Sequence, residues 1–244
     1  MIAAALQLTT TPESVHANLN TLRSLINDAT TKHNANLVVL PEYNRSLAET
    51  VKHPSTTTST TTTADTPLQD ALSDIAKEFK VFLVAGSIPT IQEPDATKFQ
   101  NTLFVFNPDG ERIATYHKIH LFKFEGPPAF DEGETVVAGA TDQSLTVALT
   151  DEWKARLSIC YDVRFPELYR QQGDQNSNNR PYNIIVCPAA FTVETGKAHW
   201  EVLLRARAIE NQAYVIASAQ VGVHPVTGRT TYGHSLIIDP WGTV

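Results

Sequence analysis

The sequence contains little cysteine and no long hydrophobic run. Only two of its 244 residues are cysteines, Cys160 and Cys187, and both lie in apolar stretches typical of strands. Two cysteines in a chain of this length cannot form the disulfide framework of a small secreted domain. No segment approaches the roughly 18 uninterrupted apolar residues of a membrane span. We therefore expect a cytoplasmic protein with reduced thiols and without a membrane partner.

Clustered positive charge is also absent. The 19 Lys and Arg residues are scattered and are outnumbered by 26 Asp and Glu residues, which gives a formal net charge of −7. Proteins that bind nucleic acid usually carry a basic patch or stripe, so we expect no nucleic-acid partner. The N-terminal stretch MIAAALQLTT lacks the basic flank and the long apolar core of a signal peptide, and it predicts a first strand.

Common catalytic motifs are missing as well. The chain has neither the G-x-S-x-G turn of serine hydrolases nor a phosphate-binding P-loop. His117 and His120 have no cluster of carboxylates or cysteines beside them in the sequence, so we expect no metal site.

Apolar periodicity predicts a mixed α/β chain. Helical spacing predicts helices at 12–33, 67–80, 166–172 and 199–212. Apolar runs predict strands at 2–8, 35–40, 81–88, 102–106, 112–117, 145–149, 155–160, 184–187, 214–219 and 234–238. Turn sequences after 106 and after 149 predict two hairpins. This mixture favours two sheets packed face to face with helices outside, rather than a simple doubly wound parallel sheet.

Nothing in the sequence suggests a boundary between domains. No internal repeat or linker is visible, and the threonine-rich stretch 55–66 and the polar stretch 173–180 predict surface loops. We expect residues 1–244 to form a single domain. The chain stops at Val244 after the turn DPWGTV, which is typical of a connection to another strand and favours a truncated C-terminal tail.

Three predicted strands end in a residue that is suited to catalysis. The run ANLVVL leads to Glu42, the strand RIATYH leads to Lys118, and the strand ARLSI leads to Cys160. A single cysteine in an apolar run is more often a core thiol than a nucleophile. The carboxylate and the ammonium group at two other strand ends reverse that expectation, because strand ends gather at the rim of a sheet, where sites are commonly built.

These three residue types suffice for acyl transfer. A thiol with its usual pKa of about 8.5 is mostly protonated at neutral pH and needs a base or a cation nearby. Glu42 can accept the thiol proton and later return it to a leaving amine. Lys118 supplies a positive charge that stabilises a thiolate and a developing oxyanion. The alternative is a papain-like pair of Cys160 with one of the histidines 117, 120, 199 or 234, although the glycine-rich setting of such cysteines is absent.

The chain resembles the nitrilase superfamily of carbon–nitrogen hydrolases along nearly its whole length. The matching stretches are LVVLPE around Glu42, YHKIHLF around Lys118, LSICYDVRFPEL around Cys160, PAAF at 188–191, HWEVLLRARAIENQAYVIASAQ from 199 and YGHSLIIDPWGTV from 232. The resemblance implies a four-layer α-β-β-α sandwich, a Glu42–Lys118–Cys160 triad, and a homodimer or larger homo-oligomer. It implies neither a metal nor an organic cofactor.

The resemblance also implies a second glutamate in the loop between the Lys118 and Cys160 strands. Glu132 in AFDEGET matches that position, where it would orient substrate or assist the base. The related branch usually carries Phe-x-Glu-Ser there, whereas this chain has Phe-Asp-Glu-Gly, so Glu134 is a neighbouring alternative.

Within the superfamily the chain looks most like the Nit-type amidases, and its substrate is expected to be a small linear carboxylated amide. Deaminated glutathione is the first candidate substrate, and 2-oxoglutaramate, the substrate of omega-amidases, is the second. A carbamoyl amine and a catalytically inactive scaffold are further alternatives. Nitriles are disfavoured because YDVRFPEL follows Cys160, where nitrilases usually carry Trp-Glu.

Residues near the three strand ends suggest supporting roles. The backbone N–H of Tyr161 is expected to act as an oxyanion donor beside Lys118. Three residues after the strand 184–187 are expected to line the acyl pocket: Ala190, Phe191 and Thr192. For Phe191 a plain core position is an equal alternative. Two further predictions concern the turn after Cys160, where Asp162 would cap the backbone and Arg164 would pair with Glu167. Cys187 is predicted to be a core thiol.

Overall fold

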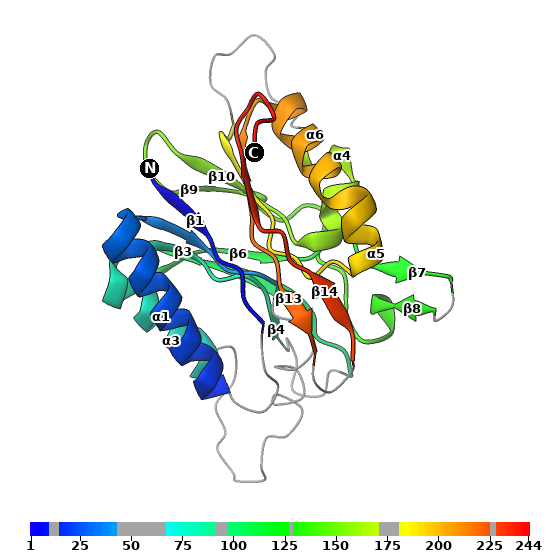
Figure 1. Ribbon diagram of the computed structural model, residues 1–244, viewed down its shortest axis with the longest axis horizontal. Helices are drawn as coiled ribbons and strands as arrows, with labels where there is room; N and C mark the ends of the chain where they lie inside the picture. Colours follow the sequence, from blue (N-terminus) through cyan, green and yellow to red (C-terminus); the bar gives the residue numbers. More distant parts are fainter. Residues whose placement is uncertain (10–14, 43–66, 91–96, 127–128, 171–180, 225–227) are drawn as a thin grey trace.

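Two β-sheets form the centre of the protein in the computed structural model (Figure 1). The structure describes residues 1–9, 15–42, 67–90, 97–126, 129–170, 181–224 and 228–244. The loops predicted at 55–66 and 173–180 lie outside the described residues, so those two predictions stay open.

The first sheet has six strands and holds most of the N-terminal half of the chain. Its strand order is β1-β2-β3-β5-β4, with β6 paired to β5. The strands are β1 (Ala3–Ala5), β2 (Leu37–Val39), β3 (Phe82–Val84), β4 (Ile88–Thr90), β5 (Gln100–Phe106) and β6 (Arg112–His117). The strands β1, β2 and β3 are parallel, whereas β5 and β6 form the antiparallel hairpin that the sequence predicts.

The second sheet has five strands in the order β15-β12-β11-β10-β9. They are β9 (Thr146–Ala148), β10 (Lys154–Leu157), β11 (Ile184–Val186), β12 (Tyr214–Ala217) and β15 (Leu236–Ile238). The strands β10, β11 and β12 are parallel, and β9 forms the predicted hairpin with β10.

Helices cover the outer face of each sheet. The helices α1 (Val15–His33) and α3 (Pro67–Phe79) lie against the first sheet. The second sheet is covered by α4 (Pro166–Tyr169) and α6 (Glu201–Asn211), and α5 (Val193–Thr195) is followed by a π-helical turn at Gly196–Trp200 (Figure 1). This arrangement confirms the α-β-β-α order of layers.

Alternation along β2 shows why this strand is a continuous apolar run. Leu37 and Val39 belong to the core between the two sheets, and Val38 belongs to the core beneath α1 and α3. A strand that is buried on both faces must be apolar at every position. The run therefore ends where the strand leaves the core, and Glu42 is placed at that end.

Two short hairpins were not expected from the sequence. They are formed by β7 (Lys123–Phe124) with β8 (Phe130–Asp131), and by β13 (Val221–Val223) with β14 (Thr230–Tyr232). Strands of two or three residues are too short to show an alternating pattern. The helix predicted at 199–212 also differs at its start, because residues 199 and 200 belong to the π-helical turn and α6 begins after them.

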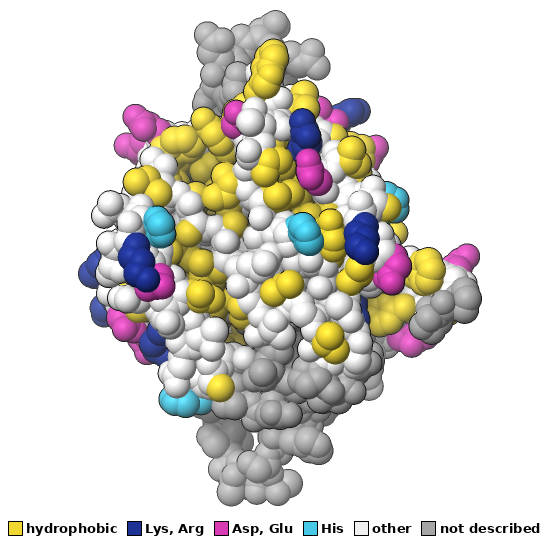
Figure 2. Space-filling model, in the orientation of Figure 1, with side chains coloured by type: hydrophobic (Ala, Val, Ile, Leu, Met, Phe, Trp, Pro, Cys, Tyr) yellow, Lys and Arg dark blue, Asp and Glu magenta, His cyan; other side chains and the backbone are white. Residues whose placement is uncertain are grey.

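The visible face of the molecule carries mixed charge. Figure 2 shows Lys and Arg side chains interspersed with Asp and Glu rather than gathered into one patch. No helix in the described part of the chain combines the length and the apolar character that a membrane crossing requires.

We expect truncation of Ile26 to destabilise the protein. This side chain lies on α1, is fully buried, and packs in the core between α1, α3 and the first sheet. Ile26→Ala should lower the free energy of unfolding in urea by about 2–5 kcal/mol, because it removes buried methylene groups and leaves a cavity. Ser24→Ala on the exposed part of the same helix should change it by less than about 0.5 kcal/mol. Equal effects of the two substitutions would contradict this assignment of the core.

Candidate active site

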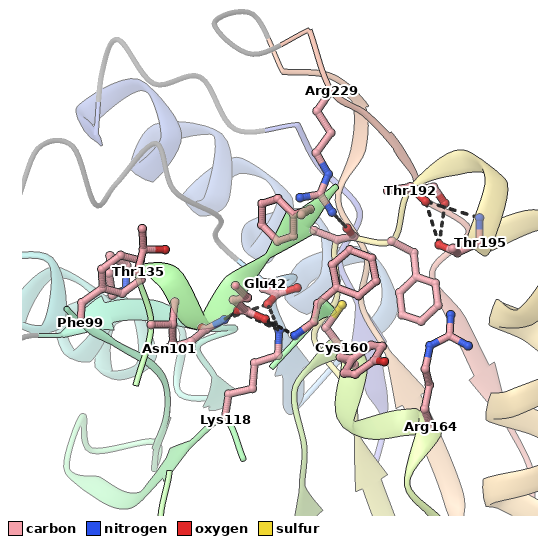
Figure 3. Close-up of a pocket in the computed structure, with 18 residues that line it drawn as sticks. Glu42, Phe99, Asn101, Lys118, Thr135, Cys160, Arg164, Thr192, Thr195 and Arg229 are labelled. Atoms are coloured by element: carbon pink, nitrogen blue, oxygen red, sulfur yellow. Dashed lines mark hydrogen bonds and ion pairs between the residues drawn. The ribbon is translucent and has the colours of Figure 1, made fainter. Parts of the chain in front are cut away.

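The structure brings Glu42, Lys118 and Cys160 together in one buried cluster. Glu42 lies just beyond β2, Lys118 directly follows β6, and Cys160 begins a 3-10 turn at Cys160–Arg164, just after β10. Their exposed fractions are 4%, 2% and 9%. In Figure 3 the three side chains point toward one another from both sheets.

Lys118 is the centre of the polar contacts in this cluster. Its Nζ lies 3.1 Å from Oε1 of Glu42 and 2.9 Å from Oε2 of Glu132. Glu132 thus lies at the site, as the resemblance implies. Its Oε2 also accepts a hydrogen bond of 2.7 Å from the backbone N–H of Phe122. Glu134 is exposed and does not line the cavity, so that alternative is wrong.

Asn101 is a member of the cluster that sequence reasoning missed. Its Nδ2 donates to Oε1 of Glu42 at 2.9 Å and lies 3.4 Å from Oε1 of Glu132. Asn101 is buried on β5, directly beside the end of β6, and its carbonyl accepts from the N–H of Lys118. The sequence feature that could have indicated Asn101 is the polar Gln-Asn pair immediately before the apolar strand predicted at 102–106.

The backbone at Cys160 has an unusual conformation. Its φ angle is +48°, in the left-handed region that costs an L-residue roughly 1–2 kcal/mol. The N–H of Cys160 donates to the carbonyl of Pro188 at 2.8 Å, which fixes the turn from the other side. The side chain is thereby turned out of the strand direction and into the cavity.

Asp162 holds this turn in place, as predicted, and also joins the two sheets. The carboxylate is fully buried and accepts hydrogen bonds from the backbone N–H of Ile159 at 2.9 Å and from Oη of Tyr116 at 2.7 Å. It also accepts from the backbone N–H of His120 at 3.0 Å. Tyr116 and His120 flank Lys118 in sequence, and Asp162 lies two residues after Cys160. One carboxylate therefore fixes the turn at Cys160 relative to the strand that ends at Lys118.

The pKa values of the cluster define its charge at rest. Burial raises the pKa of the Cys160 thiol, and the charge of Glu42 raises it further, so it lies well above its usual value although Lys118 opposes the shift. Burial would also raise the pKa of Glu42, but Lys118 and the hydrogen bonds from Cys160, Lys118 and Asn101 lower it below its usual value.

Lys118 remains charged in the same surroundings. Burial would lower its pKa, but Glu42, Glu132 and Cys160 outweigh burial and raise it. The resting cluster therefore pairs a neutral thiol with an ionised Glu42 and an ammonium group. Lys118 acts in the direction expected from the sequence, because it lowers the pKa of the Cys160 thiol, but burial and the charge of Glu42 outweigh it.

A cavity of about 730 Å³, including its opening to solvent, lies over this cluster. The cavity lining includes four phenylalanines (Phe99, Phe122, Phe130 and Phe191) and two arginines (Arg164 and Arg229). The residues that the sequence assigned to the pocket, Ala190, Phe191 and Thr192, all line it, and so does Tyr161. Arg229 was missed, because the stretch TGRTTY carries no periodic or motif signal.

Arg164 does not form the predicted ion pair with Glu167. Its guanidinium lies over the rings of Tyr161 and Phe191, 5.5 Å from each centroid, and its Nη2 is 3.3 Å from Nδ1 of His199. Glu167 is exposed. Arg164 follows Cys160 within the same turn, and this turn directs it into the cavity wall instead of along the short helix.

The four histidines that were candidates for a Cys–His pair have other partners. His117 contacts Thr102, His120 contacts Asp162, His199 contacts Arg164, and His234 contacts the carbonyl of Tyr232. None of them lines the cavity. Within the described ranges, no three His, Cys, Asp or Glu residues gather as a metal site would require. That catalysis needs neither metal nor cofactor stays a prediction.

The comparisons with known proteins agree with this geometry. The model of the carbon–nitrogen hydrolase family matches residues 2–244. The chain belongs to this family. Membership of the family confirms that the chain is a hydrolase of carbon–nitrogen bonds other than peptide bonds. It also confirms the resemblance from which the α-β-β-α fold was expected.

Relatives within the family carry amidase names. The deaminated glutathione amidase of Synechocystis sp. is 42% identical over 100% of this chain and 85% of that protein. Omega-amidase NIT2 of Mus musculus is 39% identical, with 93% of this chain and 77% of the mouse protein covered. Nit3 of Saccharomyces cerevisiae, a member of branch 10 of the nitrilase superfamily, matches at a TM-score of 0.78 and 32% identity, over 99% of this chain and 83% of the yeast protein.

We expect Asn101→Leu to move the acid limb of the activity profile of this hydrolase to higher pH. The substitution removes a hydrogen bond that lowers the pKa of Glu42, so Glu42 becomes protonated, and inactive as a base, at a higher pH than before. The measurement is kcat/KM against pH for an amide substrate. Asn27→Leu, on the exposed side of α1, should leave the profile unchanged. An acid limb that stays in place or moves to lower pH in the Asn101 variant would contradict the assignment.

Proposed function

We propose that this chain is an amidase that hydrolyses a small linear carboxylated amide, with deaminated glutathione as its substrate. The observation that carries the proposal is the buried cluster in which Glu42 and Lys118 contact each other beside Cys160, at the bottom of a cavity that opens to solvent. The 42% identity to a deaminated glutathione amidase over the whole chain supports this choice of substrate.

Acylation begins when Sγ of Cys160 attacks the carbonyl carbon of the amide. Glu42 takes the thiol proton as the carbon–sulfur bond forms, which is required because the thiol is neutral at rest. The carbonyl oxygen becomes an oxyanion that Lys118 Nζ and the backbone N–H of Tyr161 stabilise. The carbon–nitrogen bond then breaks, and Glu42 gives its proton to the leaving amine.

Deacylation uses the same groups in a second cycle. A water molecule attacks the thioester while Glu42 removes its proton. Lys118 and the Tyr161 N–H again stabilise the oxyanion. When the carbon–sulfur bond breaks, Glu42 returns the proton to Cys160, and the carboxylic acid product leaves. Glu42 passes on every proton that it takes, so the enzyme ends each cycle in its starting state.

Glu132 has a supporting role in this proposal. Both of its oxygens lie within 3.1 Å of Lys118 Nζ, and Oε2 is held by the Phe122 N–H. It keeps the ammonium group charged and fixes its direction toward the reacting carbonyl. Burial and the charge of Glu42 raise the pKa of the Cys160 thiol, so the thiol stays protonated until substrate arrives.

An omega-amidase that acts on 2-oxoglutaramate is the second candidate function. The observation in its favour is the 39% identity to omega-amidase NIT2 over 93% of this chain. A carbamoyl amine as substrate, or an inactive scaffold, would be the conclusion if neither amide is cleaved. We further propose a single hydrolase domain in a cytoplasmic setting, where a reducing environment keeps both free cysteines as thiols.

We expect 2-oxoglutarate release from deaminated glutathione to be faster, in kcat/KM, than from 2-oxoglutaramate. Both amides share the same acyl group, so one coupled assay of 2-oxoglutarate compares them. Cys160→Ala should lower the rate by at least about 10³-fold, because it removes the nucleophile. Cys187→Ala, at the other buried cysteine, should keep the activity. Full activity of the Cys160 variant would contradict the mechanism, and the reverse order of rates would favour the omega-amidase function.

We also propose a homodimer through the exposed side of α6. Val202 and Ile209 on this helix are 64% and 51% exposed and lie seven residues apart, so they share one helix face. Trp241 is 87% exposed and lies in the turn after β15. The next residue in this turn, Gly242, contacts Ile209. Large apolar side chains that gather in this way commonly mark an interface between proteins.

We expect light scattering after size exclusion to give twice the chain mass of 26.8 kDa. Val202→Glu should shift the mass to that of one chain, because it places a charge within an apolar interface. Val137→Glu, at an exposed valine distant in sequence, should leave the mass at the dimer value. Monomeric wild-type protein, or a dimer that survives Val202→Glu, would rule out this surface.

A further inference from the structure

Gln220 is a buried residue that contacts the backbone of the proposed base. It lies between β12 and β13, about 180 residues after Glu42 in the chain. Its side-chain Nε2 donates a hydrogen bond of 2.7 Å to the backbone carbonyl of Glu42. Gln220 does not belong to the described residues that line the cavity. Any effect that it has on the reaction must therefore pass through the residues that it holds.

The backbone at Glu42 is held from two directions. From the first sheet, Ser87 forms a parallel bridge with Glu42 just before β4. From the end of a strand in the second sheet, Gln220 binds the Glu42 carbonyl. The backbone sets the direction in which a side chain leaves it. These two contacts together therefore determine where the carboxylate of Glu42 starts and which way it points.

Gln220 is also bonded to the segment that supports the nucleophile. Its backbone N–H donates to the carbonyl of Ala189 at 2.9 Å. The neighbours of Ala189 on both sides bind Cys160: the carbonyl of Pro188 accepts from its N–H at 2.8 Å, and the backbone of Ala190 hydrogen-bonds its thiol. One residue thus connects the support of the nucleophile, through its own backbone, with the base, through its side chain.

The distance that this connection controls is the one between base and nucleophile. Glu42 hydrogen-bonds the thiol of Cys160 and also bonds to Lys118 and Asn101. A general base must lie within hydrogen-bond reach of the proton that it takes, and a misplacement of about 1 Å can lower a rate by about 100-fold. Glu42 and Cys160 come from different sheets, so a contact between the sheets at this point bears directly on their separation.

We infer that Gln220 is a positioning residue, whose side-chain amide holds the backbone of Glu42 so that the carboxylate stays within reach of the Cys160 thiol. The inference rests on the proposed function, because in that reaction Glu42 takes the thiol proton. Gln220 acts through the Glu42 backbone and contacts neither the substrate nor the reacting atoms.

Steady-state kinetics with the better substrate of deaminated glutathione and 2-oxoglutaramate give the first test. Gln220→Met keeps the length of the side chain and removes the donor. It should lower kcat by about 30-fold and change KM by less than about twofold, because the base is displaced while the lining of the cavity is unchanged. Gln220→Asn keeps the amide but is too short to reach the Glu42 carbonyl, so it should show the same loss and replaces the Met variant if that variant does not fold.

Gln69→Met is the matched control. Gln69 is a glutamine on α3 that is equally buried, and its side chain also has a hydrogen-bond partner, Nη1 of Arg112 at 3.2 Å. Its replacement removes one buried side-chain hydrogen bond far from the site, so kcat and KM should both stay within about twofold of the wild-type values. Circular dichroism establishes that each variant is folded before its rates are compared.

Alkylation of Cys160 by iodoacetamide at pH 8, followed by mass spectrometry, gives a second test that needs no turnover. The charge of Glu42 raises the pKa of the thiol, so a displaced carboxylate leaves a lower pKa and more thiolate. Gln220→Met should therefore speed alkylation by about threefold, and Glu42→Gln should speed it further. The other titratable groups of the cluster, Lys118 and Glu132, are present in every variant.

The double variant separates action through Glu42 from a general structural effect. In the Glu42→Gln background the charge that Gln220 positions is already absent. Gln220→Met should then change the alkylation rate by less than about 1.5-fold, because two residues that act as one unit are not additive.

Four results would overturn the inference. They are an unchanged kcat in a folded Gln220 variant, an equal loss of kcat in Gln69→Met, alkylation that is not faster in Gln220→Met, and a further change of its rate in the double variant. Failure of the proposed function gives a different result. If the wild-type protein cleaves no amide but alkylation responds as expected, hydrolysis is wrong and the positioning of Glu42 by Gln220 stands.

Discussion

The contact of Lys118 with the buried Glu42 and the partly buried Glu132 is the constraint on which the site depends. Three ionised groups away from water are stable only when each is paired and hydrogen-bonded. Glu42 and Glu132 pair with the ammonium group, and Asn101 and the Phe122 N–H provide further donors to the carboxylate oxygens. Burial, and after it the charge of Glu42, raises the pKa of the Cys160 thiol well above its usual value. Glu42 therefore both pairs with Lys118 and contributes to the raised pKa of the thiol.

The two-sheet architecture satisfies this constraint by placing each charged group at a strand end. Glu42 and Lys118 come from the first sheet, whereas Cys160 comes from the second. Asp162 connects them, since it accepts from Ile159 beside the nucleophile and from Tyr116 beside the lysine. The left-handed backbone at Cys160 is held by the same contacts.

The cavity is divided by charge along its length. Glu42, Glu132 and Lys118 meet in one cluster, and the cavity wall also carries Arg164, with its guanidinium over the rings of Tyr161 and Phe191.

The sequence by itself determined the class of fold and the catalytic triad candidates. Buried strands must be apolar throughout, so Glu42, Lys118 and Cys160 stood out as the polar residues that end them. Glu132 was found only through the resemblance, because an acid in an irregular loop has no pattern that distinguishes it from a solvated one. Tertiary structure alone decided that Asn101 bonds to Glu42 and that Arg164 contacts His199 instead of Glu167. Local spacing can indicate which residues could pair, but the position of a π-helical turn or a neighbouring strand decides which of them meet.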